Sequence, residues 1–251
     1  MGRATTNKKT KPKGKSKGAR KKATPAESPV RRVIRWAGFA FLAPTVMGVL
    51  WIVLYIFVNP PTTPYILSES RRLDGVDRQW VDLDEISPHL ARAVIAAEDA
   101  NFCLHWGFDV AAIREALDDG AGRGASTISQ QVVKNTFLWH GRSWFRKALE
   151  AVMTPLVEIL WTKKRIMEVY LNVAEFDEGI FGAEAAARNA FGVGPDALKL
   201  WQAARLAAVL PSPKRYSASN PSGYVRGRAS AHADGAETIR VDGRAECISA
   251  S

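Results

Sequence analysis

Cysteine and strand-like patterns are scarce in this sequence of 251 residues. Its two cysteines, Cys103 and Cys247, are too few for a disulfide framework, and neither has a metal-ligand spacing. They could pair in an oxidising compartment, but Cys247 lies in a segment with a disordered composition, so we expect Cys103 to be a buried free thiol. Alternation of apolar and polar residues is nearly absent, which predicts a mainly α fold.

The body of the chain lacks the positive charge that a nucleic-acid-binding domain would need. The formal net charge is +10, but residues 1–32 alone hold eight lysines and four arginines against one acid, Glu27. The rest of the chain is therefore close to neutral. A nucleic-acid-binding domain carries its positive charge on a folded face, so we expect no nucleic-acid partner. Residues 1–32 have few large apolar residues and are predicted to be a disordered basic tail.

Charge is absent from Trp36–Val58, a run of 23 residues rich in Leu, Ile, Val, Phe and Trp. A helix needs about 20 such residues to span a bilayer. A cleaved signal peptide, the alternative, has a shorter apolar core and a small-residue cleavage site. We therefore predict one transmembrane helix over residues 33–58. Its positive flank is N-terminal, which predicts a cytoplasmic tail and, in a bacterium, a periplasmic body anchored in the inner membrane.

Helical periodicity and helix start signals recur after this run. Residues 59–87 are predicted to be a linker and membrane-proximal segment, and residues 88–228 one helical domain. Ser87 and Pro88 form a helix start, with serine as the N-cap. Residues 120–124 are glycine-rich and predict a mobile loop. Residues 229–251 are small and polar, and we expect a disordered or divergent tail. Predicted helices cover 88–97, 109–118, 126–137, 143–161, 163–172, 182–190 and 195–210.

Two adjacent carboxylates, Glu98 and Asp99, close an apolar stretch that begins at Ala93. A carboxylate against apolar surface has a raised pKa, which suits proton transfer near neutral pH. The alternative is a structural N-cap or ion pair at a helix junction. His105 in the same segment is expected to be structural.

A second polar segment follows the glycine-rich loop. Ser126, Gln130 and Lys134 recur at every fourth position, which places them on one helical face. Exposed helix faces usually carry Glu/Lys pairs, whereas these groups are mostly neutral hydrogen-bonding ones. A helix start of this kind offers backbone N–H groups to an anion. A solvated helix face is the alternative.

A third segment brings cations together. Arg142, Arg146, Glu150 and Glu158 are expected to share one helical face, and an Arg146–Glu150 ion pair would explain part of this pattern. It does not explain a group of Lys134, Arg142, Arg146 and Lys147 in a neutral body. Such a group favours phosphate or pyrophosphate.

These segments, read in order, resemble the motifs of the peptidoglycan glycosyltransferases, the family of bifunctional penicillin-binding proteins and monofunctional relatives. The motifs are residues 96–109, 124–135, 146–150, 164–172 and 203–213. The order and spacing agree over residues 88–228, and residues 172–187 are most similar to the monofunctional enzymes of Gram-negative bacteria. The sequence departs from the family at Ser129, where threonine is usual, near Asp177, where glycine is usual, and after Arg228.

The resemblance implies a lysozyme-like helical domain with a membrane-embedded surface and lipid II as its substrate. It implies that Glu98 is the general base and Glu150 a second essential carboxylate, whose role is left open between metal ligand, acid and orientation of cations. Lys134, Arg142 and Arg146 would bind the pyrophosphate. Further substrate-binding positions implied by the motifs are Ser126, Thr127, Gln130, Gln131, Asp99 and Asn135.

Several alternatives stay open at this point. No dedicated metal motif is present, although Mg²⁺ or Mn²⁺ at Glu98 or Glu150 would suit the oxygen ligands and a pyrophosphate. The expected partners are lipid II, the growing glycan strand and the membrane through Trp36–Val58, with division or elongation proteins as further candidates. Two rival functions are a lysozyme-like lytic transglycosylase and a membrane-anchored scaffold that has lost activity.

Overall fold

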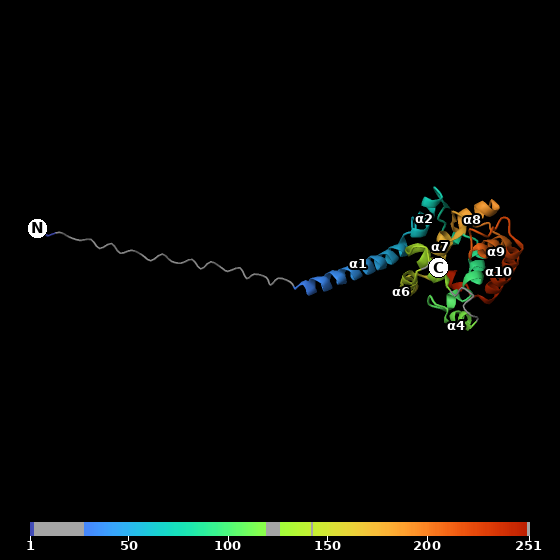
Figure 1. The fold of residues 1–251 in the computed structure, drawn as a ribbon. Coiled ribbons are helices and arrows are strands. Elements are labelled where there is room, and N and C mark those ends of the chain that lie inside the picture. The colour runs from blue at the N-terminus through green and yellow to red at the C-terminus, as the bar shows by residue number, and fades with distance from the viewer. Residues whose placement is uncertain (3–27, 119–125, 142, 250–251) are drawn as a thin grey trace. The chain divides into compact units, whose positions relative to one another are not determined.

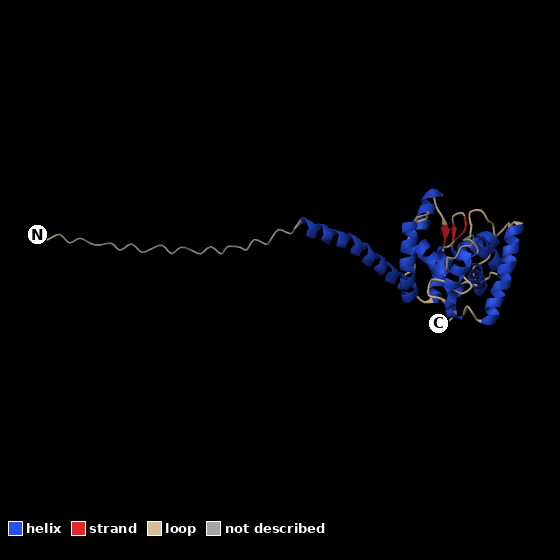
Figure 2. Cartoon of the chain, turned by 60° about the horizontal axis from the view of Figure 1, so that its bottom comes forward, coloured by secondary structure: helices blue, strands red, loops and turns tan. Residues whose placement is uncertain are grey.

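The computed structural model describes residues 1–2, 28–118, 126–141 and 143–249 of the chain. The chain divides into two compact units, Met1–Thr45 and Val46–Ser251. Helix α1 (Pro29–Phe57) runs through the boundary between them. The described residues are mainly helical, so the predicted fold class is confirmed (Figures 1 and 2).

Helix α1 is long and apolar enough to cross a membrane, with a mean hydropathy of 2.2 over its most apolar window. Most of that window is not covered by other parts of the protein. Its last turns differ, because Ile52 and Tyr55 are buried in the second unit. There the indole of Trp161 donates to the Ile52 carbonyl at 2.9 Å, and Arg165 Nε donates to the Tyr55 carbonyl at 3.0 Å. The helix end is thus bonded to the folded body.

The second unit begins before residue 88. Helix α2 (Pro64–Arg72) starts at the N-cap Thr63, whose hydroxyl accepts from the Ile66 N–H at 3.2 Å. Strand β1 (Asp77–Arg78) and the short 3₁₀ helix η1 (Leu83–Glu85) follow. β1 pairs in parallel with β3 (Ile180–Phe181), which pairs antiparallel with β2 (Glu175–Asp177) in the order β1-β3-β2. The segment predicted to be a linker is therefore part of the folded body.

Helices build the core of the second unit. In chain order they are α3 (Pro88–Glu98), η2 (Phe102–Leu104), α4 (Val110–Asp118), α5 (Ile128–Phe137), α6 (Trp144–Leu160), α7 (Lys163–Val173), α8 (Gly182–Phe191), α9 (Leu200–Val209), α10 (Gly223–Asp242) and η3 (Glu246–Ile248). α3 packs against both α9 and α10, and α5 packs against α6 and α7. Alanines line much of α8 and α9 and are fully buried, which lets backbones approach closely.

The predicted helices agree with the observed ones in position, and their ends differ for local reasons. α5 starts at Ile128 because Thr127 is its N-cap: the Thr127 hydroxyl accepts from the Gln130 N–H at 3.2 Å. α9 starts at Leu200, five residues after the predicted start at Pro195, and the Gln202 side chain accepts from the Lys199 N–H at 2.8 Å. The glycine-rich loop at 120–124 lies outside the described residues, as do residues 3–27 of the basic tail.

The expectation of a disordered tail from residue 229 is wrong for the residues that the structure describes there. α10 continues through this segment to Asp242 and ends at Gly243, whose φ of +74° is the left-handed conformation that glycine adopts without strain. Ala229, Ala236 and Ile239 are buried against the body. The segment looked disordered because most of its buried residues are alanines, with few large apolar side chains among them.

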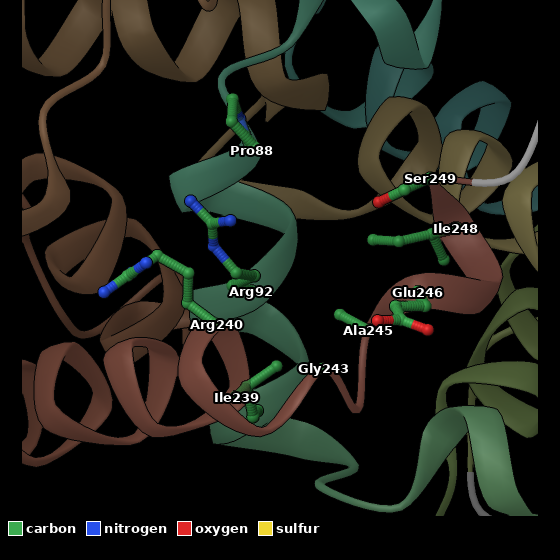
Figure 3. Close-up of a pocket in the computed structure, with 9 residues that line it drawn as sticks. All are labelled: Pro88, Arg92, Ile239, Arg240, Gly243, Ala245, Glu246, Ile248 and Ser249. Atoms are coloured by element: carbon green, nitrogen blue, oxygen red, sulfur yellow. The ribbon is translucent and has the colours of Figure 1, made fainter.

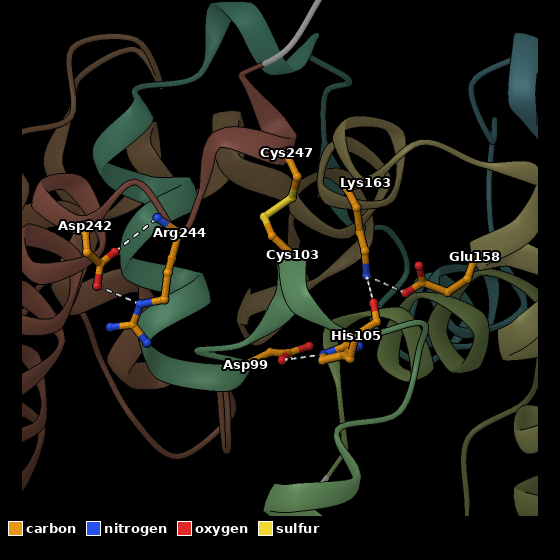
Figure 4. Close-up of a disulfide and its surroundings, with 8 residues drawn as sticks. All are labelled: Asp99, Cys103, His105, Glu158, Lys163, Asp242, Arg244 and Cys247. Atoms are coloured by element: carbon orange, nitrogen blue, oxygen red, sulfur yellow. Dashed lines mark hydrogen bonds and ion pairs between the residues drawn. A yellow bond between two sulfur atoms is a disulfide. The ribbon is translucent and has the colours of Figure 1, made fainter.

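The expectation of a free Cys103 thiol is also wrong. Cys103 in η2 and Cys247 in η3 form a disulfide that joins positions 144 residues apart (Figure 4). The short segment after Gly243 turns back along the body, where Ala245 and Ile248 are buried. The disulfide fastens this end of the chain to the turn that follows α3.

We predict that removing the disulfide lowers stability. Closure of a loop this long restricts the unfolded chain, and loss of such a bond costs about 2–5 kcal/mol. The Cys103→Ser/Cys247→Ser double variant should therefore unfold at a lower temperature or urea concentration than the wild type under non-reducing conditions. A reductant should lower the unfolding midpoint of the wild type and leave that of the double variant unchanged. Two titratable thiols in the native, unreduced protein would contradict the pairing.

Candidate functional site

Glu98 is the last residue of α3, where the apolar helix ends. The Gln131 side chain, from α5, donates from Nε2 to Glu98 Oε2 at 2.8 Å. Burial raises the pKa of Glu98 above its ordinary value of 4.5. The Gln131 hydrogen bond and the charges of Arg228 and Lys134 lower this pKa, and the neighbouring Asp99 raises it. Glu98 thus has the raised pKa that the sequence predicted, for the physical reason it predicted.

A buried tyrosine orients Gln131. The Tyr170 hydroxyl, from α7, donates to Gln131 Oε1 at 3.4 Å. This contact directs the amide nitrogen of Gln131 towards Glu98. Burial and the charges of Glu98 and Asp99 raise the pKa of Tyr170 far above 10, so its hydroxyl stays a donor. Helices α3, α5 and α7 therefore meet in one chain of hydrogen bonds that ends at Glu98.

Asp99 is buried and serves the structure around Glu98. Its Oδ1 lies 2.8 Å from His105 Nε2, and its Oδ2 accepts from the Ile128 N–H at 3.0 Å (Figure 4). One carboxylate thus binds the turn after α3 and the first residue of α5. Both oxygens are used within the protein, which favours a positioning role over the predicted contact with substrate. The structural role expected for His105 is confirmed.

The start of α5 is fixed by further side-chain bonds. Thr127 and Gln130 form a capping box in which the Thr127 N–H donates to Gln130 Oε1 at 3.0 Å. The Thr127 hydroxyl also donates to the Gly107 carbonyl at 2.7 Å. Gly107 has a φ of +88°, and a Cβ there would lie 2.6 Å from Thr154 Cγ2. Only glycine fits this contact, which brings the turn after η2 against α6.

Cations gather beside Glu98, around the buried Glu150 of α6. Arg146 Nη1 donates to Glu150 Oε2 at 3.2 Å, and Lys147 Nζ donates to the other carboxylate oxygen. Lys134 of α5 lies close enough to Glu150, Arg146 and Lys147 to interact with them electrostatically. Burial lowers the pKa of Lys134, as do the charges of Arg146 and Lys147, while Glu150 and Glu98 raise it. The structure therefore brings Glu98, Lys134, Arg146 and Glu150 together.

The remaining predicted positions differ in their surroundings. The Ser126 hydroxyl, ahead of α5, accepts from Lys147 Nζ at 3.5 Å and is exposed. Asn135 is buried next to Lys134, and its Oδ1 has no hydrogen-bond partner among the described residues. Glu158 does not join the cation group: it accepts from Ser129 and from Lys163, the latter at 2.8 Å. Arg142 lies outside the residues that the structure describes.

A hollow of about 280 Å³ opens at Glu98. Its lining comes from the end of α3, from α4 and from the start of α5, and consists of Ala96, Ala97, Glu98, Asp99, Ala100, Asn101, Asp109, Ala112, Glu115, Ser126 and Thr127. Glu98 thus borders open space, and its carboxylate lies within electrostatic range of Lys134. This arrangement suits a reaction that removes a proton at one point and stabilises an anion nearby.

The donor set does not favour a metal ion at either predicted carboxylate. Within the described ranges, no three histidine, cysteine or acidic side chains are grouped so as to bind a metal ion. Glu150 accepts from two cations, Arg146 and Lys147, and Glu98 accepts from the Gln131 amide. We therefore derive no step of the chemistry through a metal.

Three further residues join the surroundings of the predicted site. Tyr170, within the motif at residues 164–172, is buried and orients Gln131. Arg228 and His232 were not among the predicted site residues: Arg228 was the last residue of the region that matches the family, and His232 has no metal-ligand spacing. A signal was present for the last two: they lie four residues apart and share a face if the segment is helical.

Comparison with known proteins identifies a family. A family profile described as Transglycosylase matches residues 66–236. A protein of Jannaschia sp. named biosynthetic peptidoglycan transglycosylase is 58% identical over 214 residues, 85% of this chain and 90% of its own length. Proteins of the same name from Caulobacter vibrioides and Rhodospirillum centenum are 46% and 45% identical, and each is covered over 98% of its length.

We predict that Thr127→Val lowers the free energy of unfolding. The substitution removes the N-cap acceptor and the bond to the Gly107 carbonyl, and loss of an N-cap alone costs about 1 kcal/mol. Urea unfolding should show a lower midpoint with an unchanged slope. Thr127→Ser, which keeps the hydroxyl, is the matched control and should lie near the wild type. Equal midpoints for all three proteins would contradict the capping role.

Proposed function

Because this chain belongs to the transglycosylase family, with biosynthetic peptidoglycan transglycosylases as relatives, we propose that it polymerises lipid II into β-1,4-linked glycan strands. It is a glycosyltransferase that acts on peptidoglycan, with a lysozyme-like helical domain. The observation that carries the proposal is a half-buried carboxylate with a raised pKa, Glu98, beside a separate group of cations. Polymerisation needs both features, since a proton must be removed and a pyrophosphate must leave.

Glu98 is the general base of this proposal. Its carboxylate takes the proton from the 4-hydroxyl of the acceptor sugar as that oxygen attacks the anomeric carbon of the growing chain. The new C–O bond forms as the bond to undecaprenyl diphosphate breaks on the opposite side, which inverts the anomeric configuration. The proton remains on Glu98, which burial favours in its neutral form. Gln131 holds the carboxylate in place throughout.

The cation group stabilises the leaving pyrophosphate. Lys134 is partly buried, and within the described part of the chain no carboxylate forms an ion pair with it, so its charge is available to an anion. Arg146 is bonded to Glu150 and to the Gly141 carbonyl, which directs its guanidinium. Of the roles left open for Glu150, these contacts support orientation of cations over proton transfer. Arg142 is proposed to join the group by its position in the motif.

The membrane is the proposed location of this reaction, since the leaving group carries a lipid. α1 is apolar enough to anchor the chain, and we propose that its basic flank keeps the N-terminus in the cytoplasm and the body in the periplasm. Apolar side chains are also exposed on the second unit. They include Leu104, Trp106, Val110, Leu117, Trp139, Trp144, Phe145, Val152 and Ile159. We propose that this surface contacts the bilayer near the site.

The cation group argues against the first rival function, a lysozyme-like lytic transglycosylase. A glycan-cleaving enzyme of similar fold would also use one glutamate, but it would have no pyrophosphate to stabilise. Lys134, Arg146 and Lys147 lie beside the base and have no role in cleavage of a glycan alone. Both motif carboxylates, Glu98 and Glu150, are present, which argues against the second rival, a membrane-anchored scaffold that has lost activity.

We predict that Glu98→Gln abolishes polymerisation of labelled lipid II by the full-length protein in detergent. The amide keeps the size of the side chain but cannot accept the proton, so loss of a general base should lower the rate by at least about 10²-fold. A gel of products should show long glycan with the wild type and none with the variant. Unchanged polymer from Glu98→Gln would exclude this base. Shortened glycan from added sacculi would support the lytic rival.

The raised pKa of Glu98 gives a second prediction. The base must be deprotonated, so activity should fall as pH decreases through the pKa of Glu98, and this fall should have its midpoint above the ordinary value of 4.5. Gln131→Leu removes a hydrogen bond to the charged form, so the midpoint should move to higher pH. Initial rates of polymerisation across pH provide the measurement. A midpoint that moves to lower pH in Gln131→Leu would contradict the proposed geometry.

A further inference from the structure

Arg228 of α10 is a half-buried cation without a charged partner among the described residues. Its Nη1 donates to the Tyr224 hydroxyl at 3.5 Å, and its Nη2 lies 3.4 Å from His232 Nε2. Most other half-buried cations of the second unit bind a carboxylate, as Arg146 and Lys163 do. The charge of Arg228 is therefore not neutralised locally, and it acts on groups further away.

The packing of α10 directs Arg228 towards the base. Near the end of α10, Ile239 and Arg240 lie beside Arg92 in the first half of α3 (Figure 3). Earlier in α10, Gly235 is so close to Ala96 that an added Cβ would lie 2.9 Å from the Ala96 methyl group. The two helices thus run antiparallel. The first half of α10, which carries Arg228, faces the end of α3, which carries Glu98.

His232 holds the guanidinium without adding charge. It lies one turn after Arg228 on the same face of α10. Burial and the charge of Arg228 lower the pKa of His232 to about 4, so the imidazole is neutral at physiological pH. A neutral imidazole can accept a hydrogen bond at Nε2, which matches the contact with Arg228.

The field at Glu98 comes from groups on four segments. Burial raises its pKa most, and Asp99, next in the chain, raises it further. Gln131 and Lys134 of α5 and Arg228 of α10 lower it, with Arg228 having a larger effect than Lys134. Tyr170 of α7 is uncharged. Two cations therefore favour the charged form of Glu98, one from the cation group and one from α10.

Lys134 and Arg228 would differ in their effect on Glu98 once an anionic substrate is bound. Under the proposed function, a pyrophosphate on Lys134 would neutralise that lysine and add negative charge near Glu98. Arg228 lies on another helix and takes no part in the cation group. We propose that Arg228 is a positioning residue that keeps Glu98 in its charged, proton-accepting form while pyrophosphate occupies the cation group. This inference rests on the proposed polymerase function and assigns a role to α10 in it.

The test is the pH dependence of kcat with saturating lipid II, because kcat reports the ionisation of groups in the enzyme–substrate complex. The full-length proteins compared are the wild type, two neutral variants, Arg228→Gln and Arg228→Leu, and Arg228→Lys, which keeps the charge. Between about pH 8 and pH 5.5 the ratio of wild-type to neutral-variant kcat should grow several-fold as pH falls, with KM changing little. Arg228→Lys should recover most of the wild-type profile. Arg226→Gln, an exposed position two residues away, is the matched control and should follow the wild type.

A constant ratio across pH would overturn the inference, since a purely structural role lowers kcat equally at all pH values. A neutral variant with the wild-type profile would also overturn it. Circular dichroism identifies any variant that fails to fold, and because Arg228→Gln is polar and Arg228→Leu is apolar, a folding defect in one of them leaves the other to be measured. Failure of the wild type to polymerise lipid II would instead refute the proposed function itself, and this inference with it.

Discussion

The arrangement of the candidate site depends on the hydrogen bonds of the Asp99 carboxylate. Its two oxygens bind His105 and the Ile128 N–H, so a single buried group joins the turn after α3 to the start of α5. Glu98 precedes Asp99 in the chain, and Gln131 lies about one turn after Ile128 in α5. A shift of this group would move the base and its hydrogen-bond donor apart. A charged hydrogen bond of this kind is stronger than a neutral one, and its loss would leave a buried carboxylate without partners.

The site separates two electrostatic demands that conflict. A base that accepts a proton benefits from low polarity, whereas a leaving pyrophosphate needs positive charge. Under the proposed function, Glu98 at the apolar end of α3 meets the first demand, and the cations of α5 and α6 meet the second. Glu150 makes the second arrangement possible, because Arg146 and Lys147 would repel each other without a shared carboxylate. The buried Glu158 binds no member of the cation group; it accepts hydrogen bonds from Ser129 and Lys163.

The C-terminal segment contributes to the fold and also to the surroundings of Glu98. Small residues let α10 approach α3 closely, and the disulfide from Cys247 to Cys103 fastens the chain after α10 to η2. η2 in turn lies between Asp99 and His105 (Figure 4). Under the proposed roles, α10 therefore influences Glu98 in two ways, through the charge of Arg228 and through the turn that carries His105.

The sequence by itself determined the local features. Spacing and capping residues predicted most helices to within two residues, the apolar run predicted the membrane-spanning candidate, and the position of Glu98 at the end of an apolar stretch predicted its raised pKa. The contacts between distant segments were decided by the tertiary structure: the Cys103–Cys247 bond, the Tyr170–Gln131 contact and the approach of Arg228 to Glu98. The physical reason is the range of the interactions. Periodicity and caps act over one or two turns and can be read from neighbours, whereas α10, rich in alanine and glycine with a weak apolar stripe, becomes an ordered helix through its packing on α3.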